Sequence, residues 1–166
     1  MKKLIAIPVL AGAVLTLAPI RSESHGITVA EVRGYVERMG MQPVPHPKSA
    51  NALVVSRAMS DDRGRLDLYI DIRENKTLVL TAYAKIEGRY FNLARASDSE
   101  KLFRRLLETN HHSFATFFVD EQGDIGARFT FTTENGVGFE SFRVAATELL
   151  RISEEYAPVL EENMKK

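Results

Sequence analysis

The sequence predicts an α+β fold of order α-βββ-α-ββ-α, in which helices pack against a single antiparallel sheet. Apolar and polar residues alternate over 66–73 and again over 77–86, the pattern of a sheet with one solvent-exposed face. In three other segments apolar residues recur at helical spacing. The turns between the predicted strands are short, which favours antiparallel neighbours. A chain of 166 residues with 45% hydrophobic residues is expected to form one domain that buries a hydrophobic core.

The first helix is predicted from Thr28 to about Met39. Thr28 and Glu31 have the spacing of a capping box, and Gly40 is a natural stop. The apolar positions at helical spacing are Val29, Val32, Val36 and Met39. The proline-rich segment 43–47 cannot be helical, so we expect an extended connector there.

Three strands are predicted next, over 52–58, 66–73 and 77–86. In the second of them Leu66, Leu68 and Ile70 alternate with polar or aromatic residues, as in a sheet with one wet face. The turn at Glu87-Gly88 leads into 89–93, a candidate extension of the sheet. These three strands should therefore be neighbours in the sheet.

The C-terminal half is predicted to add a helix, two strands and a last helix. Ser97 and Glu100 have capping-box spacing ahead of a helix that reaches about Asn110. Strands are expected over 114–120 and 126–132, joined by a turn at 121–124. The last helix begins near Phe139, and Pro158 is expected to kink or end it.

The N-terminal segment 1–24 has the plan of a secretory signal peptide. A basic start is followed by an apolar run over 4–17, and Ser22 and Ser24 supply small residues for cleavage near Ser24. The run is short for a bilayer-spanning helix, so we expect no stable membrane insertion after processing. The predicted product is a domain over 25–166 that is periplasmic or secreted.

Composition excludes several classes of function. Lys and Arg number 22 and Asp and Glu number 22, so the chain lacks the basic field of a nucleic-acid-binding protein. It has no cysteine, which excludes disulfides, thiolate metal sites and cysteine nucleophiles. We expect no cofactor.

Three polar clusters are candidate metal or catalytic sites. His111, His112 and Glu108 have spacing for metal ligands, but imidazoles also favour a helix C-terminus. The acidic segment 120–124 lacks the ligand spacing of a calcium loop and is more typical of a turn. Asp67 and Asp71 belong to one strand face, about 13 Å apart by strand rise, which is too far for paired acid–base chemistry and typical of a wet face. We therefore expect no metal and no catalytic set.

Aromatic residues crowd the last predicted hairpin. Phe117 and Phe118 are consecutive in a strand, so their side chains must point to opposite faces of the sheet. If helices cover only one face, one of the two belongs to an uncovered surface that is available to a partner.

Two C-terminal segments have a distinctive pattern. One extends from Asn110 to Ile125 and includes Phe114-Ala115 and Phe117-Phe118-Val119-Asp120-Glu121-Gln122-Gly123-Asp124. The other is Ile152-Ser153-Glu154-Glu155-Tyr156-Ala157-Pro158-Val159-Leu160. Both resemble the YbjN family of bacterial sensory transduction regulators. The resemblance implies a fold similar to class I type III secretion chaperones. It also implies a non-enzymatic, often dimeric, protein-binding scaffold with no catalytic set.

The leading hypothesis is an exported binding or regulatory domain that engages a protein or peptide through its sheet and an exposed strand edge. The candidate contact residues are Tyr69, Arg73, Tyr83, Phe117 and Phe118. The alternative is a sensor for a small apolar ligand, held between the sheet and the C-terminal helix. Its pocket would be lined by Leu78, Leu80, Phe129, Phe142 and Leu149. A hydrolase or metal-dependent enzyme is the third hypothesis.

Overall fold

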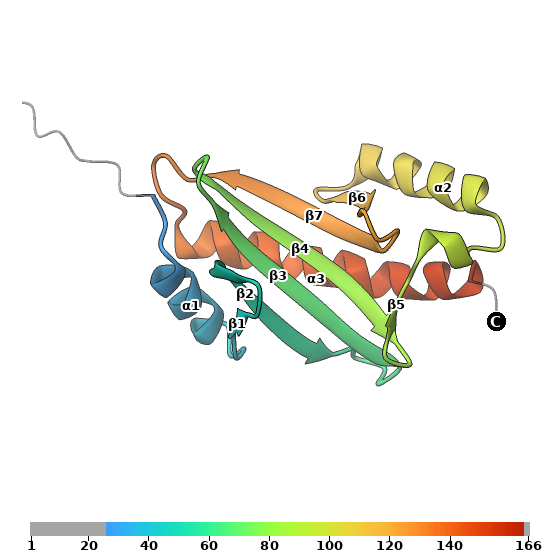
Figure 1. Cartoon of the computed structure of the whole chain (residues 1–166), viewed down its shortest axis with the longest axis horizontal. Helices are drawn as coiled ribbons and strands as arrows, with labels where there is room; N and C mark the ends of the chain where they lie inside the picture. The colour runs from blue at the N-terminus through green and yellow to red at the C-terminus, as the bar shows by residue number, and fades with distance from the viewer. Residues whose placement is uncertain (1–25, 165–166) are drawn as a thin grey trace, which may run out of the picture.

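The computed structural model describes residues 26–164 as three α-helices and one seven-stranded sheet (Figure 1). The predicted signal peptide lies outside the described residues. In chain order the elements are α1 (Val29–Arg38), β1 (Val44–His46), β2 (Ser49–Ala58), β3 (Gly64–Arg73), β4 (Thr77–Ile86), β5 (Arg89–Tyr90), a 3₁₀ turn (Leu93–Arg95), α2 (Ser99–His112), β6 (Thr116–Val119), β7 (Ile125–Thr132) and α3 (Phe139–Glu162).

The sheet confirms the predicted α+β class. Its strand order is β1-β2-β3-β4-β7-β6, with β5 added beside β4, and every pairing is antiparallel. The three central strands are joined by short turns, as the sequence predicts. On the side of β4 that faces away from β3, residues 77–82 pair with β7, and Lys85 and Ile86 pair with β5.

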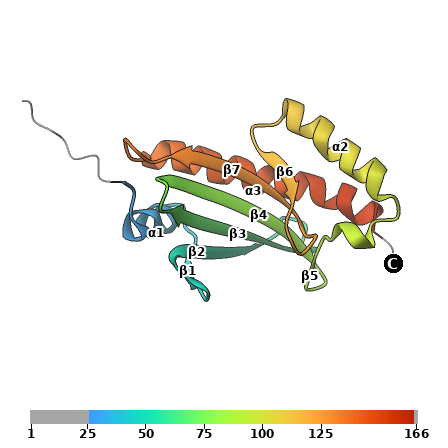
Figure 2. The same ribbon diagram turned by 45° about the horizontal axis from the view of Figure 1, so that its top comes forward.

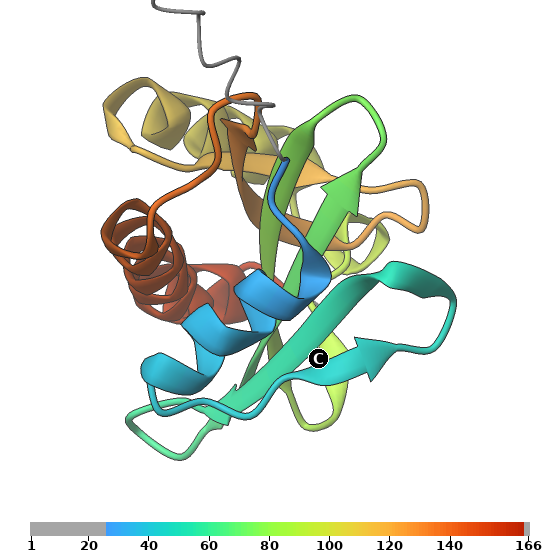
Figure 3. The same cartoon turned by 90° about the vertical axis from the view of Figure 1, so that its left-hand side faces the viewer.

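The helices gather on one side of the sheet. α3 runs along β4 and β7 (Figures 1 and 2), and Figure 3 places α1 and α3 on the same side. The β1–β2 turn and the β6–β7 turn project on the opposite side (Figure 3). The fully buried side chains between sheet and helices include Leu66, Leu68, Ile70, Leu78, Leu80, Phe142 and Leu149. Among residues 26–164, no helix is both long and apolar enough to cross a membrane.

The proline-rich connector forms an edge strand. β1 pairs with β2 through Val44 and Pro45, and the register shifts before His46. Proline lacks a backbone N–H and is tolerated where a strand faces no further neighbour. The prediction of extended backbone was therefore correct, but it missed the pairing.

Two helix boundaries differ from expectation. The N-cap of α2 is Asp98, whose side chain accepts a bond from Lys101 N at 2.9 Å, so the predicted Ser97 cap is wrong by one residue. Pro158 does not end α3, which continues to Glu162. Tertiary contacts hold this last turn because Leu160 is buried and Asn163 O accepts a bond from Ser97 N at 2.7 Å.

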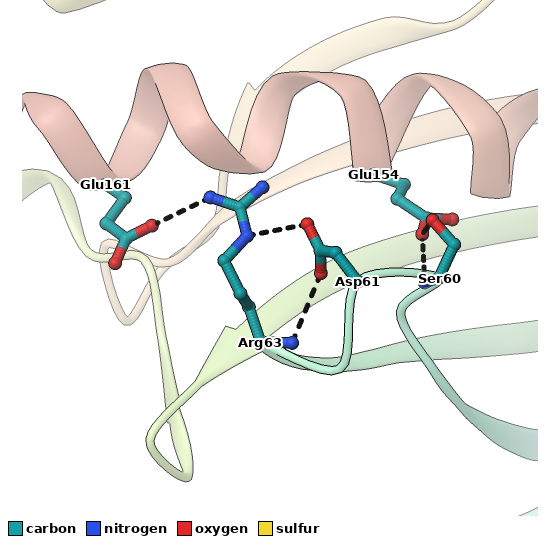
Figure 4. A network of polar contacts seen from close by, with 5 residues as sticks. All are labelled: Ser60, Asp61, Arg63, Glu154 and Glu161. Carbon is teal, nitrogen blue, oxygen red and sulfur yellow. Dashed lines mark hydrogen bonds and ion pairs between the residues drawn. The ribbon is translucent and has the colours of Figure 1, made fainter.

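Polar contacts attach the β2–β3 turn to α3 (Figure 4). Glu154 accepts bonds from both Ser60 N and Ser60 Oγ, and it forms a 2.7 Å ion pair with Arg57. Two turns further along the helix, Glu161 lies 3.3 Å from Arg63, which also pairs with Asp61 at 2.6 Å. The turn is thus fixed to the C-terminal part of α3.

Candidate functional site

A groove of about 600 Å³ crosses the face of the sheet that the helices leave uncovered. The β1–β2 turn and the β6–β7 turn form its two ends, and β2, β3 and β4 form its floor and walls. Its lining includes His46, Lys48, Tyr69, Asp71, Arg73, Val79, Thr81, Tyr83, Tyr90, Asp120, Gln122 and Asp124. We call this surface the outer groove.

The floor of the outer groove consists of small side chains. Ala52, Val79 and Thr81 point to this face, yet Val79 is only 3% and Thr81 only 8% exposed. The strand register sets Val79 beside Asp71 and Thr81 beside Tyr69. Longer neighbours therefore rise around a low floor, which produces a hollow rather than a flat sheet surface.

Four aromatic rings form the wall of the groove. Tyr83 is central, with ring centroids 5.7 Å from Tyr69, 5.3 Å from Tyr90 and 6.0 Å from Phe118. The Tyr69 pair is T-shaped, a favoured arrangement for aromatic rings. His46 adds a fifth ring at 5.8 Å from Tyr69. The rings support one another and present a rigid, amphipathic surface.

The buried carboxylate of Asp67 holds the aromatic wall in place through hydrogen bonds. Tyr90 OH donates to Asp67 Oδ2 at 2.6 Å, Ser56 Oγ donates to Asp67 Oδ1, and Tyr69 OH lies 2.9 Å from Tyr90 OH. Burial and the bond to Asp67 raise the pKa of Tyr90 well above its usual value. The expectation that Asp67 belongs to a solvent-exposed face is wrong: the carboxylate is buried, and Tyr90 and Ser56 satisfy it with hydrogen bonds.

The acidic segment 120–124 is a turn, as predicted, and it positions Tyr83. Asp120 Oδ1 accepts bonds from Gln122 N and Asp124 N, both at 2.9 Å, and Gly123 has a φ of +83°. Tyr83 OH donates to Asp120 Oδ2 at 3.0 Å. Burial and this carboxylate raise the pKa of Tyr83 well above its usual value.

Charge is distributed unevenly along the outer groove. Lys48 and Arg73 lie at the end formed by the β1–β2 turn, where Arg73 also pairs with Asp71 at 3.1 Å. Asp120 and Asp124 lie at the other end, in the β6–β7 turn. The groove is therefore cationic towards one end and anionic towards the other.

The structure brings together four of the five predicted contact residues. Tyr69, Arg73 and Tyr83 line the groove, and Phe118 packs beside Tyr83. Phe117 lies on the opposite face, where it is buried against Tyr156 at 4.7 Å between centroids. The predicted opposition of the two phenylalanines is thus confirmed, and Phe118 is the one that faces outward.

Sequence reasoning missed Tyr90 and Gly126 as parts of this surface. Tyr90 lies in the two-residue strand β5, too short for a periodic signal, although its place after Glu87-Gly88 indicated a hairpin. A Cβ on Gly126 would lie 2.9 Å from the Tyr83 ring and 3.0 Å from the Phe118 ring. A glycine inside a predicted strand signals such a close approach.

Both outer strands of the sheet are protected against strand addition. β1 is three residues long and contains Pro45. On the other edge, Phe117 of β6 makes two backbone bonds to the side chain of Asn110. β6 does not cover the whole of β7, because β7 continues from Phe129 to Thr132 beyond its last pair with β6. The geometry therefore favours binding on the face over addition at β1 or β6.

The other predicted site types gain no support from the geometry. Within residues 26–164, no three His, Cys, Asp or Glu side chains are grouped so as to hold a metal ion. In the apolar pocket of the alternative hypothesis, Leu78, Leu80, Phe142 and Leu149 are fully buried members of the core. They have no surface left to offer a ligand.

Comparison with known proteins agrees with this architecture. The family model YbjN, described as "Putative bacterial sensory transduction regulator", matches residues 28–162. A search of curated proteins found no match. Among solved structures, the ExsC–ExsE complex contains a similar chain, with a TM-score of 0.53, 17% identity, and coverage of 81% of this chain and 97% of that chain. The HopA1–SchA chaperone–effector complex gives 0.51, 12%, 76% and 89%. The expected chaperone-like fold is confirmed.

Proposed function

The chain belongs to the YbjN family, and from this premise we propose that it is a non-enzymatic binding domain that holds a protein partner in its outer groove. The observation that carries the proposal is the groove itself. It is a hollow of about 600 Å³ on the face of the sheet opposite the helices, walled by Tyr69, Tyr83 and Tyr90. Tyrosine is enriched at protein interfaces because it combines a large apolar ring with a polar end.

The similar solved structures support a protein as the partner. Both are complexes, and one is a chaperone bound to an effector. The polypeptide fold they share with this chain is therefore one that binds other proteins in those two cases. Family membership and fold together favour binding over catalysis, and we propose no reaction.

The test is to fill the groove without disturbing its walls. Thr81 lies on the floor, so Thr81→Arg would occupy the hollow, whereas Thr116→Arg places the same side chain on the exposed edge of the same face. Arg73→Glu with Tyr83→Ala tests the predicted contacts, but Tyr83→Ala also removes a bond to Asp120. Thr81→Arg is therefore the sharper variant.

The readout is crosslinking in native cells, capture of the tagged protein and mass spectrometry. We expect a recurrent partner to be recovered with the parent protein and with Thr116→Arg, and to be lost with Thr81→Arg while the circular dichroism spectrum is unchanged. Equal recovery of that partner with a folded Thr81→Arg protein would remove the outer groove from consideration.

We also propose that the protein is exported. The supporting observation is the sequence of 1–24, with its basic start, apolar run and small residues before the cut near Ser24. The N-terminal peptide of the purified protein tests this. A start near His25 in the periplasmic or secreted fraction is expected, and an intact Met1 in a soluble cytoplasmic fraction would overturn export.

A further inference from the structure

We infer that the outer groove selects an extended segment with an acidic side chain at one end and a basic side chain about six residues away. This inference rests on the proposed function and specifies the chemistry of the partner. Three observations support it: the charges of the lining, the contacts between cations and the aromatic wall, and the register of β3 and β4.

The lining charges set the polarity. Lys48 is exposed in the β1–β2 turn, and Arg73 is exposed at the C-terminal end of β3. At the other end Asp120 and Asp124 are held by the bonds of the β6–β7 turn. A partner with the opposite order of charges meets an attractive group at both ends, and one with the same order is repelled at both, which gives selectivity.

The aromatic wall already binds cations. Lys85 Nζ lies 5.0 Å from the ring centroid of Tyr90, and Arg128 Cζ lies 4.0 Å from that of Phe118. Cations are attracted to the negative face of an aromatic ring. A basic side chain of a partner is therefore compatible with the aromatic wall, and the carboxylates of Asp120 and Asp124 place that basic residue at the Asp120 end.

The strand register gives the spacing. Tyr83, which bonds Asp120, lies opposite Asp67 in the register of β3 and β4. Arg73 is six residues further along β3, which corresponds to about 20 Å at the rise of a strand. An extended partner segment of about six residues spans the same distance.

The experiment is selection of peptides from a random ten-residue display library on the full folded domain. Three variants are compared with the parent. Lys48→Glu removes the net positive charge of the cationic end, and Gln122→Lys weakens the anionic end without touching the carboxylates that form the turn. Glu121→Lys is the matched control, because it introduces a lysine side chain in the same turn at an exposed residue outside the groove lining.

We expect the parent and Glu121→Lys to enrich peptides with an acidic and a basic residue about six positions apart. The double variant Lys48→Glu with Gln122→Lys should lower binding of these peptides at least tenfold and no longer enrich this order of charges. One contrary result would be peptides whose binding is lost with Thr81→Arg but which share no charge pattern. That result would overturn the inference and leave the proposed function standing. Peptides insensitive to Thr81→Arg would overturn the inference, and the cellular capture experiment would decide the proposed function independently.

Discussion

The side chain of Asn110 forms with the backbone of Phe117 the two hydrogen bonds that a neighbouring strand would form. Asn110 Nδ2 donates to Phe117 O at 3.0 Å, and Phe117 N donates to Asn110 Oδ1 at 2.6 Å. The two backbone groups that β6 would offer to an added strand at Phe117 are therefore occupied from within the chain. An exposed strand edge promotes association between chains, and natural sheets block such edges. Asn110 both attaches α2 to the sheet and closes the edge.

Asn110→Ala should destabilise the protein and open β6. The variant loses two hydrogen bonds and leaves the N–H and C=O of Phe117 without their partner in α2. We therefore expect a loss of about 2 kcal/mol in the free energy of unfolding. Urea denaturation measures this loss, and light scattering measures self-association. Glu108→Ala, which removes an exposed polar side chain two residues earlier on α2, is the control. Unchanged stability and a monomeric state would show that the Asn110 bonds do not protect the edge.

Gly126→Ala should disturb the aromatic wall from beneath. The added Cβ would lie 2.9 Å from Tyr83 and 3.0 Å from Phe118, and packed rings cannot move away as an exposed chain end can. Overpacking of this kind costs about 1–3 kcal/mol. A double-mutant cycle with Tyr83→Ala checks the cause by urea denaturation. The cost of Gly126→Ala should shrink when Tyr83 is already removed, and an equal cost in both backgrounds would contradict the steric explanation.

The sequence predicted the fold well where one physical cause dominated. The alternation in β3 and β4 arises because every second side chain belongs to the core beneath the helices, and helical spacing in α1 and α3 follows from packing on the sheet. Pro158 does not end α3, because contacts distant in sequence, such as the bond between Ser97 and Asn163, hold the last turn. The N-cap of α2 was misplaced because Ser97 and Asp98 are both good caps.

The outer groove was only partly predictable. Tyr69, Arg73 and Tyr83 were identified because they alternate with core residues and so had to face outward. Asp67 belongs to the same face and was expected to be solvated. Its burial depends on Tyr90, which the β5 hairpin brings from 23 residues away. No period or motif encodes such a contact.

Stability should fall at alkaline pH because of Tyr83 and Tyr90. Both have pKa values raised in the folded protein, by burial and by carboxylate partners. In the unfolded chain tyrosine loses its proton near pH 10. Above that pH the unfolded state binds fewer protons than the folded state, so the free energy of unfolding decreases as pH rises.

Urea denaturation at about pH 8 and about pH 11 tests this pH dependence. The parent protein should lose stability between the two values, and tyrosinate absorbance should show that part of the ionisation coincides with unfolding. Tyr83→Phe with Tyr90→Phe is less stable at the lower pH because two bonds to carboxylates are lost, but its further loss on raising the pH should be smaller. An identical pH dependence in the double variant would contradict the assignment.

Glu154 should stabilise the attachment of the β2–β3 turn to α3 in a pH-dependent way. The bonds from Ser60 hold the pKa of this carboxyl below its usual value, with Arg57 adding to the effect. Its stabilising contribution is therefore complete above the unfolded pKa and is lost as pH falls through the folded pKa. Glu154→Gln should cost about 2 kcal/mol at neutral pH, since a carboxylate accepting several bonds is replaced by a neutral amide. The difference from the parent protein should narrow as the solution is acidified. Glu162→Gln, an exposed substitution at the end of the same helix, is the control and should change stability little. A Glu154→Gln deficit that stays constant from neutral to acid pH would mean that shape, rather than charge, fixes the turn to the helix.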